Sequence, residues 1–547
     1  MTSPKTILDE FLQPLDIDIN KVHALAKSLC EIFKRLSNES TTQFLATPVF
    51  EEVLRPEVEG KGRYLAIDIG GSNLRAGFVE LFNRTTQDGF TSPGKVNKVL
   101  EKSWKIGETH KCNNAEELFL WIGMCIAEVV QDGMDKWGLQ LPSELSMGVT
   151  FSFPIRQSSL NKAIISSMGK GFSIPSDLNL GQQILKGYET STASRPHLPH
   201  IKITAIVNDC VATLIFLSHQ HRHTPHQKAA MGLIVGTGCN ATIPLSFSKL
   251  NSFKYSHHAF KLGNHKQKDI KMAVNTEWSI NGTAPPLYAL NFITKWDSIL
   301  DTNSDNPGFM PFEYMTGGKY LGELCRLIIL DYFTTNLRIH PESLPLVLRE
   351  HNALDASVLA RVGREELLCH PLDLTMPFPI DSTTGKSKKW VPELAHAVVT
   401  ITKKVEVRCA GMVAAAIVAL LAAADEIYLP SSRPPSSLSP KNISEQPKLK
   451  QARSTKELGQ VKELLVGYTG SCISYFQDYL ADCQAYLDDI LRQEFGPDKG
   501  GKRIILEACM DGSIIGAGLL AATVEFMEKK RSSAEGLVAE NSRTESN

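Results

Sequence analysis

Residues 65–79 read Leu65-Ala66-Ile67-Asp68-Ile69-Gly70-Gly71-Ser72-Asn73-Leu74-Arg75-Ala76-Gly77-Phe78-Val79: an apolar run, a Gly-Gly-Ser turn and a second apolar run. The first run carries one aspartate, Asp68, and a lone carboxylate in a buried strand is costly to desolvate. Glycine lets backbone N–H groups approach an anion closely, and Ser72 adds a hydroxyl. Asp68 could then hold a hydrated Mg²⁺ beside bound phosphates. The alternative is an ordinary hairpin with a satisfied core aspartate.

A second stretch repeats this layout at residues 232–243, which read Gly-Leu-Ile-Val-Gly-Thr-Gly-Cys-Asn-Ala-Thr-Ile. Two such hairpins indicate two related halves that face one nucleotide. Neither is a P-loop, because no Gly-Lys-Ser/Thr follows. The Gly-x-Gly-x-x-Ala spacing also matches a dinucleotide site. Against that reading, Pro244 follows almost at once, the next residues have a strand pattern, and no acid lies about 20 residues further on.

Length and composition narrow the class. A chain of 547 residues exceeds one ordinary domain, so two lobes that share a core are expected. A net charge of −1 predicts no bulk attraction to nucleic acid or to an anionic membrane. The 11 cysteines include no Cys-x-x-Cys pair, and Met1–Lys5 starts no apolar signal core. A cytoplasmic protein with reduced thiols is therefore expected, and association with the nucleus or the mitochondrial surface is left open.

Periodicity predicts the organisation. Helical spacing over residues 5–45, followed by alternating strands and helices from 64 to 242, predicts an α/β fold. Residues 318–333 and 403–424 have the pattern of long helices. The longest apolar run, Cys409–Ala424, is shorter than the ~18 residues of a membrane span, so a buried helix is expected.

Two polar segments differ from the rest of the chain. Residues 431–458 are rich in Ser and Pro and predict a disordered insertion, and residues 528–547 predict a disordered tail. The histidines at 219, 221, 223 and 226 are expected in a solvated loop, with a weak metal site as the alternative.

Short polar residues gather at the ends of several predicted strands. They occur in Gly148–Pro154, in Met168–Phe172, in Ile203–Thr213, in Val274–Trp278 and between Asn306 and Tyr320. A sugar presents many hydroxyls, and Ser, Asn, Asp and Glu on rigid strand ends supply the short donors and acceptors that it needs. Asp209 taken alone is also a plausible helix N-cap, because an apolar helix follows it.

With these motifs in order from about Gly62 to Ala522, the chain resembles a eukaryotic hexokinase. The resemblance implies an α/β, two-lobed actin/hexokinase (ribonuclease H-like) fold with a cleft between a small and a large domain. The implied ranges are an N-terminal helical segment at 1–60, a small lobe at 61–212 and a large lobe at 213–527. The implied activity is ATP-dependent phosphorylation of a hexose, glucose first, at its 6-hydroxyl, feeding glycolysis. The alternative is a hexose-binding, catalytically weak or inactive regulator or sugar sensor that acts through a protein partner.

The resemblance also implies a role for each matching residue. Asp209 is expected to be the general base, and Lys170 to neutralise charge on the transferring phosphoryl group. Asp68 is expected to orient Mg²⁺ through water. The residues expected to surround the hexose are Ser152, Phe153, Lys170, Asn208, Asp209, Asn240, Glu277 and Glu313. Those expected to contact ATP are Gly70, Gly71, Ser72, Asn73, Arg75, Gly236, Thr237, Gly238, Gly318, Lys319, Gly470 and Ser471.

Departures from the family pattern cluster on the expected adenosine side. Thr469 stands where the family has Asp, and Ile514 and Ile515 stand where it has Gly and Lys. Glu406 replaces a small hydroxyl residue. If these side chains face the nucleotide, they remove a cation, add bulk and add one negative charge. The expectation is intact hexose binding with weak ATP binding.

Overall fold

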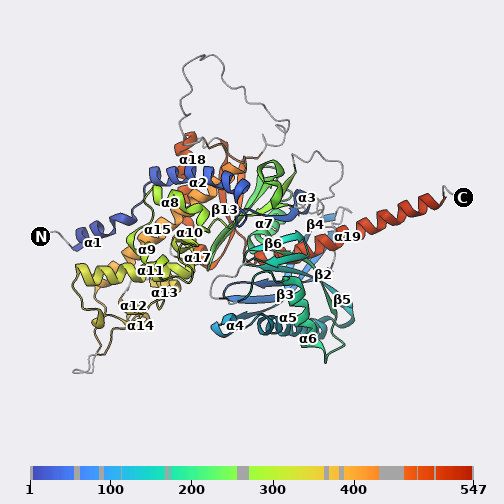
Figure 1. The fold of residues 1–547 in the computed structure, drawn as a ribbon, viewed down its shortest axis with the longest axis horizontal. Helices are drawn as coiled ribbons and strands as arrows, with labels where there is room; N and C mark the ends of the chain where they lie inside the picture. The colour runs from blue at the N-terminus through green and yellow to red at the C-terminus, as the bar shows by residue number, and fades with distance from the viewer. Residues whose placement is uncertain are drawn as a thin grey trace, which may run out of the picture.

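The computed structural model describes residues 4–54, 62–85, 91–112, 114–166, 172, 174–255, 270–362, 369–380, 387–429, 461–476, 478–497 and 501–544. Within these residues the chain forms two α/β lobes, seen side by side in Figure 1. The expected insertion at 431–458 and Lys170 lie outside the described residues.

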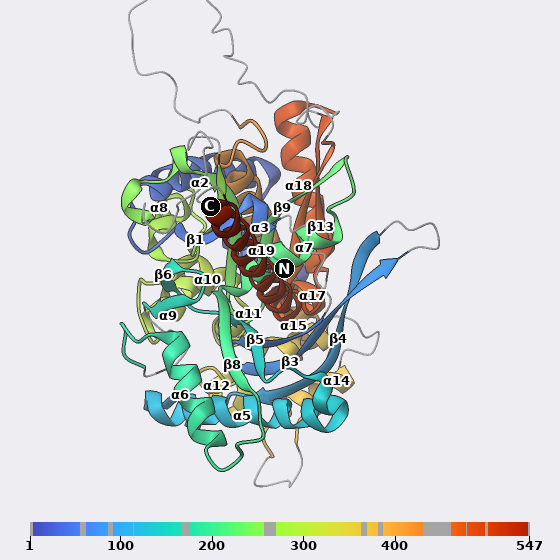
Figure 2. The ribbon, with the colours of Figure 1, turned by 90° about the vertical axis from the view of Figure 1, so that its right-hand side faces the viewer.

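The small lobe is built on a five-stranded sheet with the order β4-β3-β2-β5-β8. Strands β2, β3 and β4 are antiparallel neighbours, whereas β5 and β8 run parallel to β2. Helices α5 and α6 lie along one face, at the bottom of Figure 2. The elements of this lobe are β2 (Gly62–Ile69), β3 (Asn73–Thr85), β4 (Thr91–Lys105), α4 (Glu108–Cys112), α5 (Ala115–Trp137), β5 (Glu144–Phe151), β6 (Ile155–Ser159), β7 (Lys162–Ile165), α6 (Leu180–Thr192) and β8 (His200–Val207).

The large lobe is built on a six-stranded sheet with the order β1-β11-β10-β9-β12-β13. Its strands are β1 (Leu45–Phe50), β9 (Gln227–Val235), β10 (Cys239–Ser246), β11 (Lys271–Asn275), β12 (Glu463–Thr469) and β13 (Arg503–Ala508). Its helices include α1 (Pro4–Leu12), α2 (Ile19–Glu39), α3 (Glu51–Leu54), α8 (Ala284–Ala289), α9 (Lys295–Thr302), α10 (Pro311–Thr316), α11 (Gly318–Asp331), α12 (Leu346–Arg349), α13 (Ala356–Val362), α14 (Cys369–Thr375), α15 (Pro392–Ala423), α17 (Ser471–Tyr475) and α18 (Tyr479–Phe495).

The apolar helix α15 is the centre of the large-lobe core. By length and composition it could cross a membrane, but 94% of its most apolar window is buried inside the protein. Nearly all its residues from Val405 to Ala423 are inaccessible to solvent. Small alanine side chains let neighbouring helices approach it on every side. The expected buried helix is confirmed.

Two helices join the lobes. Helix α7 (Asp209–Gln220) and the start of α19 (Gly512–Thr544) share one apolar cluster with strands of both sheets. The contact is close, because a Cβ at Gly148 of β5 would stand 2.0 Å from the carbonyl oxygen of Ala517. Only glycine permits this approach of helix to sheet. Asp209 is thereby placed at the junction between the lobes.

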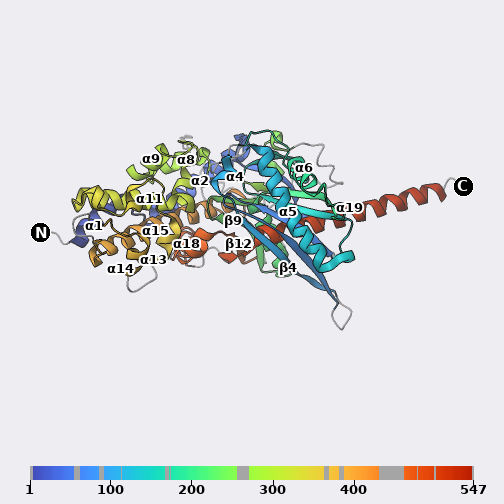
Figure 3. The same ribbon diagram turned by 90° about the horizontal axis from the view of Figure 1, so that it is seen from below.

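The segments at the two ends of the sequence pack differently from what the expected domain ranges imply. The N-terminal segment is helical to Glu39, but β1 then pairs with β11, and α1 and α2 pack into the large-lobe core. Residues 512–527, expected in the large lobe, instead cover the small-lobe sheet. The expected disordered tail is wrong for residues 528–544, which continue α19 as a helix that projects from the body in Figures 1 and 3. Glu and Lys favour helix and pair along it, as Lys529 does with Glu525.

Candidate active site

The two glycine-rich stretches form the predicted hairpins, and their turns meet. Strand β2 pairs antiparallel with β3, and β9 pairs antiparallel with β10. The hydroxyl oxygens of Ser72 and Thr237, one from each turn, lie 3.3 Å apart in hydrogen-bond contact. At the start of α11, the backbone N–H groups of Gly318 and Lys319 donate to the carbonyls of Gly236 and Thr237. Both turns are thus fixed around one point between the lobes.

Two cavities open on either side of these turns. The first has a volume of about 420 Å³, and the second about 650 Å³. Residues of both turns, Gly71, Ser72, Gly236 and Thr237, line both cavities, together with Ser471. The smaller cavity carries carboxylates and amides, and we call it the sugar-side cavity. The larger carries two lysines, an arginine and two aromatic residues, and we call it the nucleotide-side cavity.

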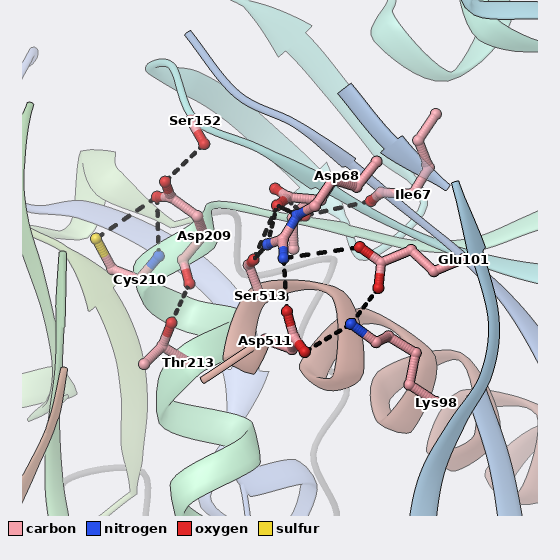
Figure 4. Close-up of polar contacts among 12 residues, drawn as sticks. Ile67, Asp68, Lys98, Glu101, Ser152, Asp209, Cys210, Thr213, Asp511 and Ser513 are labelled. Carbon is pink, nitrogen blue, oxygen red and sulfur yellow. Dashed lines mark hydrogen bonds and ion pairs between the residues drawn. The ribbon is translucent and has the colours of Figure 1, made fainter. Parts of the chain in front are cut away.

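Asp209 stands at the first position of α7, on the wall of the sugar-side cavity. Figure 4 shows its carboxylate receiving the hydroxyl of Ser152 at 2.6 Å and the backbone N–H of Cys210 at 2.9 Å. The N-terminus of a helix stabilises a negative charge, so this placement favours an ionised carboxylate. Asn208 caps the helix through Cys210 N–H and donates to the carbonyl of Phe151, which ties α7 to the end of β5. Asn208 therefore supports Asp209 and does not line either cavity.

The opposite wall carries Asn240, Glu277 and Glu313 from the large lobe. The side-chain amides of Asn240 and Asn275 donate to one oxygen of Glu277, at 3.2 and 2.8 Å. Glu313 accepts the backbone N–H of Cys239 at 3.1 Å. A Cβ at Gly238 would stand 2.5 Å from the carboxylate of Glu313, so a larger residue in this turn would displace that side chain. These fixed polar groups line the same cavity as Asp209.

Asp68 lies at the end of β2 within a network of charges. Arg75 donates twice to Asp68 Oδ2, at 2.6 and 3.1 Å, and its other nitrogen reaches Asp511 at 2.8 Å. Ser513 donates to Asp68 Oδ2, and Lys98 donates to Asp511 (Figure 4). The other carboxylate oxygen, Asp68 Oδ1, accepts the hydroxyl of Thr150 at 2.8 Å. Arg75 therefore links β2 to the start of α19.

This geometry fits an outer-sphere Mg²⁺ site. Asp68 Oδ1 has capacity for a further donor such as a metal-bound water, and the hydroxyls of Ser72 and Thr237 lie beside it on the cavity wall. Among the described residues, no group of three His, Cys, Asp or Glu side chains could hold a metal by itself. Mg²⁺ usually keeps several waters and binds substrate phosphates, so a single carboxylate suffices for the protein's share.

Most of the residues expected at the site are brought together, with two exceptions in the described chain. Phe153 does not line the sugar-side cavity. Its ring packs in the small-lobe core, 5.1 Å from the rings of both Phe151 and Phe172, because a large apolar ring at a strand end gains more by burial. Asn208 acts from behind, as described above. The expected ATP contacts divide: Asn73 and Arg75 line the sugar-side cavity, whereas Gly318 and Lys319 line the nucleotide-side cavity.

The substitutions that predicted weak ATP binding do not line the nucleotide-side cavity. Ile514 is fully buried in the apolar cluster between the lobes, and Ile515 packs against that cluster. Glu406 is buried on α15, 2.7 Å from the Lys403 ammonium. Helical geometry explains Ile514, because on α19 it faces the strands that the helix covers. The physical basis for expecting weak ATP binding is thus absent from the described cavity.

Much of the wall of the nucleotide-side cavity comes from residues that no sequence motif marks. Residues 352–361 form one side, with Arg361 and Lys111 as cations beside Lys319. Tyr475 offers a ring that is 56% exposed. The backbone N–H of Asn352 donates to Glu323 at 2.7 Å, which anchors this wall to α11. Residues 352–361 contain no recognisable motif. The one hint in the sequence is the Glu323–Arg326 pair at i,i+3, since Glu323 is the residue to which this wall is anchored.

Two α/β lobes around adjoining sugar-sized and nucleotide-sized cavities define a class, the two-lobed sugar kinases of the actin/hexokinase fold. Two hexokinase family models match this chain, one over residues 7–219 and the other over residues 230–523. The chain therefore belongs to the hexokinase family, and it is an ATP-dependent hexose kinase, a phosphotransferase acting on an alcohol group.

Individual relatives agree with this assignment. Hexokinase-1 of Nicotiana tabacum is 27% identical over 522 residues, which cover 94% of this chain and 90% of that protein. Hexokinase-1 of Saccharomyces cerevisiae is 30% identical over 362 residues, 66% of this chain and 68% of that protein. The structure of Schistosoma mansoni hexokinase complexed with glucose matches with a TM-score of 0.68 at 23% identity, covering 95% of this chain and all of that one, and shows the same fold. A non-catalytic regulator is not favoured.

Proposed function

We propose that this protein transfers the terminal phosphoryl group of MgATP to the 6-hydroxyl of glucose, with Asp209 as the general base. The observation that carries the proposal is the placement of Asp209. It stands on the sugar-side cavity, next to the two turns that lead into the nucleotide-side cavity. Glucose is chosen because the solved relative from Schistosoma mansoni is complexed with it.

The chemistry follows from the arrangement of acceptors. Asn240, Glu277 and Glu313 would hold the sugar hydroxyls and present O6 toward Asp209. As O6 attacks the terminal phosphorus, the Asp209 carboxylate accepts the O6 proton, the phosphorus–oxygen bond to ADP breaks, and ADP leaves with the electron pair. Such transition states are loose, so positioning contributes more than basicity. Ser152 keeps the carboxylate oriented through its 2.6 Å hydrogen bond.

The phosphates would lie between the two turns. Backbone N–H groups of Gly70–Asn73 and Gly236–Gly238, with the hydroxyls of Ser72 and Thr237, are the donors there. Mg²⁺, when bound, would neutralise phosphate charge, and Asp68 would accept hydrogen bonds from its waters. Lys319 and Arg361 would contribute positive charge from the nucleotide-side wall.

The test is the Asp209→Asn variant, which keeps the shape and removes the basic oxygen. We expect kcat to fall by about 10²- to 10⁴-fold, the usual loss of a general base, with glucose affinity largely kept. Glucose 6-phosphate formation measures kcat, and calorimetry measures the glucose Kd. The matched control is Asp135→Asn, at an exposed aspartate of α5 away from both cavities. A kcat equal to that of the control would disprove the assignment.

A further inference from the structure

Glu277 reaches the sugar-side cavity from a strained backbone. Its φ is +46°, in the left-handed region that non-glycine residues seldom adopt. Such a conformation is energetically costly and persists only where surrounding contacts hold it. Asn240 and Asn275 hold the side chain of Glu277, so other contacts must hold its backbone in this conformation.

Residues 40–44, near the N-terminus, contact the backbone of Glu277 and of its neighbour Thr276. The side-chain amide of Gln43 donates to the carbonyl of Glu277 at 2.8 Å. The backbone N–H of Phe44 donates to the carbonyl of Thr276 at 2.9 Å. Phe44 itself is fully buried with a φ of +54°, so a second strained residue faces the first. Two consecutive carbonyls of the sugar-binding loop are thus held by two consecutive residues from far upstream.

Gln43 is itself held tightly. It is 1% exposed, and a Cβ at Gly282 would stand 2.0 Å from its Oε1. Its backbone N–H donates to the hydroxyl of Ser40 at 3.0 Å. A side chain packed in this way has one orientation, and its amide N–H groups point to Glu277.

Lys254 fixes the same segment from the other side. Its ammonium donates to the carbonyls of Leu36, Gln43 and Phe44, at 3.0, 2.7 and 3.2 Å. Three ammonium donors meet three carbonyl acceptors. The Leu36 carbonyl, in the last turn of α2, also accepts the backbone N–H of Ser40 at 3.1 Å, so Lys254 ties residues 40–44 to the end of this helix. Burial lowers the pKa of Lys254 to about 8, whereas the three carbonyl contacts favour its charged form. We call Lys254 and residues 40–44 the brace.

We propose that the brace is a positioning device for hexose binding, in which Gln43 and Lys254 hold Glu277 in its binding conformation without touching the sugar. The proposal rests on the proposed function only in that Glu277 binds the hexose. The amide of Gln43 and the ammonium of Lys254 both lie outside the sequence motifs that carry the sugar-binding residues. We propose that they set the affinity for the hexose and leave the nucleotide-side cavity unaffected.

The experiment measures hexose KM, ATP KM and kcat for Gln43→Met and Lys254→Met, which keep side-chain bulk and remove the donors. We expect Gln43→Met to raise the hexose KM by about fivefold to fiftyfold. The Glu277 carbonyl then loses its 2.8 Å hydrogen bond from Gln43 and keeps only the 3.2 Å one from the backbone N–H of Ile280 among the described residues, so the backbone of Glu277 is held less firmly. Lys254→Met should act in the same direction, and Lys254→Arg should restore most of the affinity. ATP KM should stay at the value of the parent protein in all three.

Two further variants separate the possible outcomes. The double variant Gln43→Met/Lys254→Met should raise hexose KM by less than the product of the two single effects, because both act through one segment. Glu277→Gln tests the premise: if it leaves the hexose KM unchanged, the proposed sugar site itself is wrong. If Glu277→Gln weakens hexose binding while Gln43→Met and Lys254→Met lower only thermal stability, the brace is structural and the proposal is overturned. Should Gln43→Met fail to fold, the two Lys254 variants decide the question.

Discussion

At the scale of single residues, the role of a side chain follows from its position in the fold more than from its place in a sequence motif. Glu406 illustrates this, because in the sequence it suggested an added negative charge near the nucleotide. In the structure it is a buried carboxyl on α15, next to Lys403, which also contacts Asp478 and Asp482. Burial raises the pKa of Glu406 to about 7, against the opposing effect of Lys403.

This shift has a consequence for stability. Between its ordinary value near 4.5 and about 7, the native protein holds a proton on Glu406 that the unfolded chain has lost. The free energy of unfolding therefore falls as the pH rises through this window and is level above it. We expect Glu406→Gln to be more stable than the parent at pH 8 by about 1–3 kcal/mol, with little difference at pH 4.5. Urea unfolding at both pH values measures this, and an equal difference at both would contradict it.

At the scale of elements, the two hairpins and their polar strand ends were predictable. An apolar run, a Gly-rich turn and a hydroxyl specify a local structure, and Asp68, Ser72, Thr237 and Asp209 lie where that reasoning placed them. Contacts between distant segments were not predictable in this way. Gln43 and Glu277 are 234 residues apart in the chain, and no periodicity connects them. The direction in which Ile514 points depends on which sheet α19 covers, and the local sequence does not encode that packing.

For Ile514, the structure predicts a role in stability where the sequence predicted an effect on ATP binding. Because this side chain fills the cluster between the lobes, Ile514→Ala should cost about 2–5 kcal/mol of stability through a cavity. It should leave the affinity for MgATP unchanged, since residue 514 does not line the nucleotide-side cavity. Denaturant unfolding and calorimetry with MgATP measure the two effects. Tighter ATP binding without loss of stability would show that Ile514 faces the nucleotide after all.

At the scale of the whole molecule, the sugar-side cavity draws on both lobes. Ser152 comes from the small lobe, and Asn240, Glu277 and Glu313 come from the large lobe. A ligand that binds only the native state stabilises it by about 2.7 kcal/mol at 100 times its Kd. We expect glucose to raise the melting temperature of one common transition for both lobes. Differential scanning calorimetry with and without glucose is the measurement, and a second, unshifted transition would show that the lobes unfold independently.

The path of the chain through the lobes also bears on synthesis. The small-lobe sheet is complete once β8 ends at Val207, but the helix that covers it, α19, begins only at Gly512. At about 5–20 residues per second, the roughly 300 intervening residues take on the order of 15–60 s to emerge from a ribosome. Throughout that interval the apolar face of β2, β5 and β8 lacks its partner and is exposed to other nascent chains. A segment translated about 300 residues after β8 thus completes the small lobe, and a truncated product ending before it would carry a bare hydrophobic sheet, a natural target for chaperones and proteases.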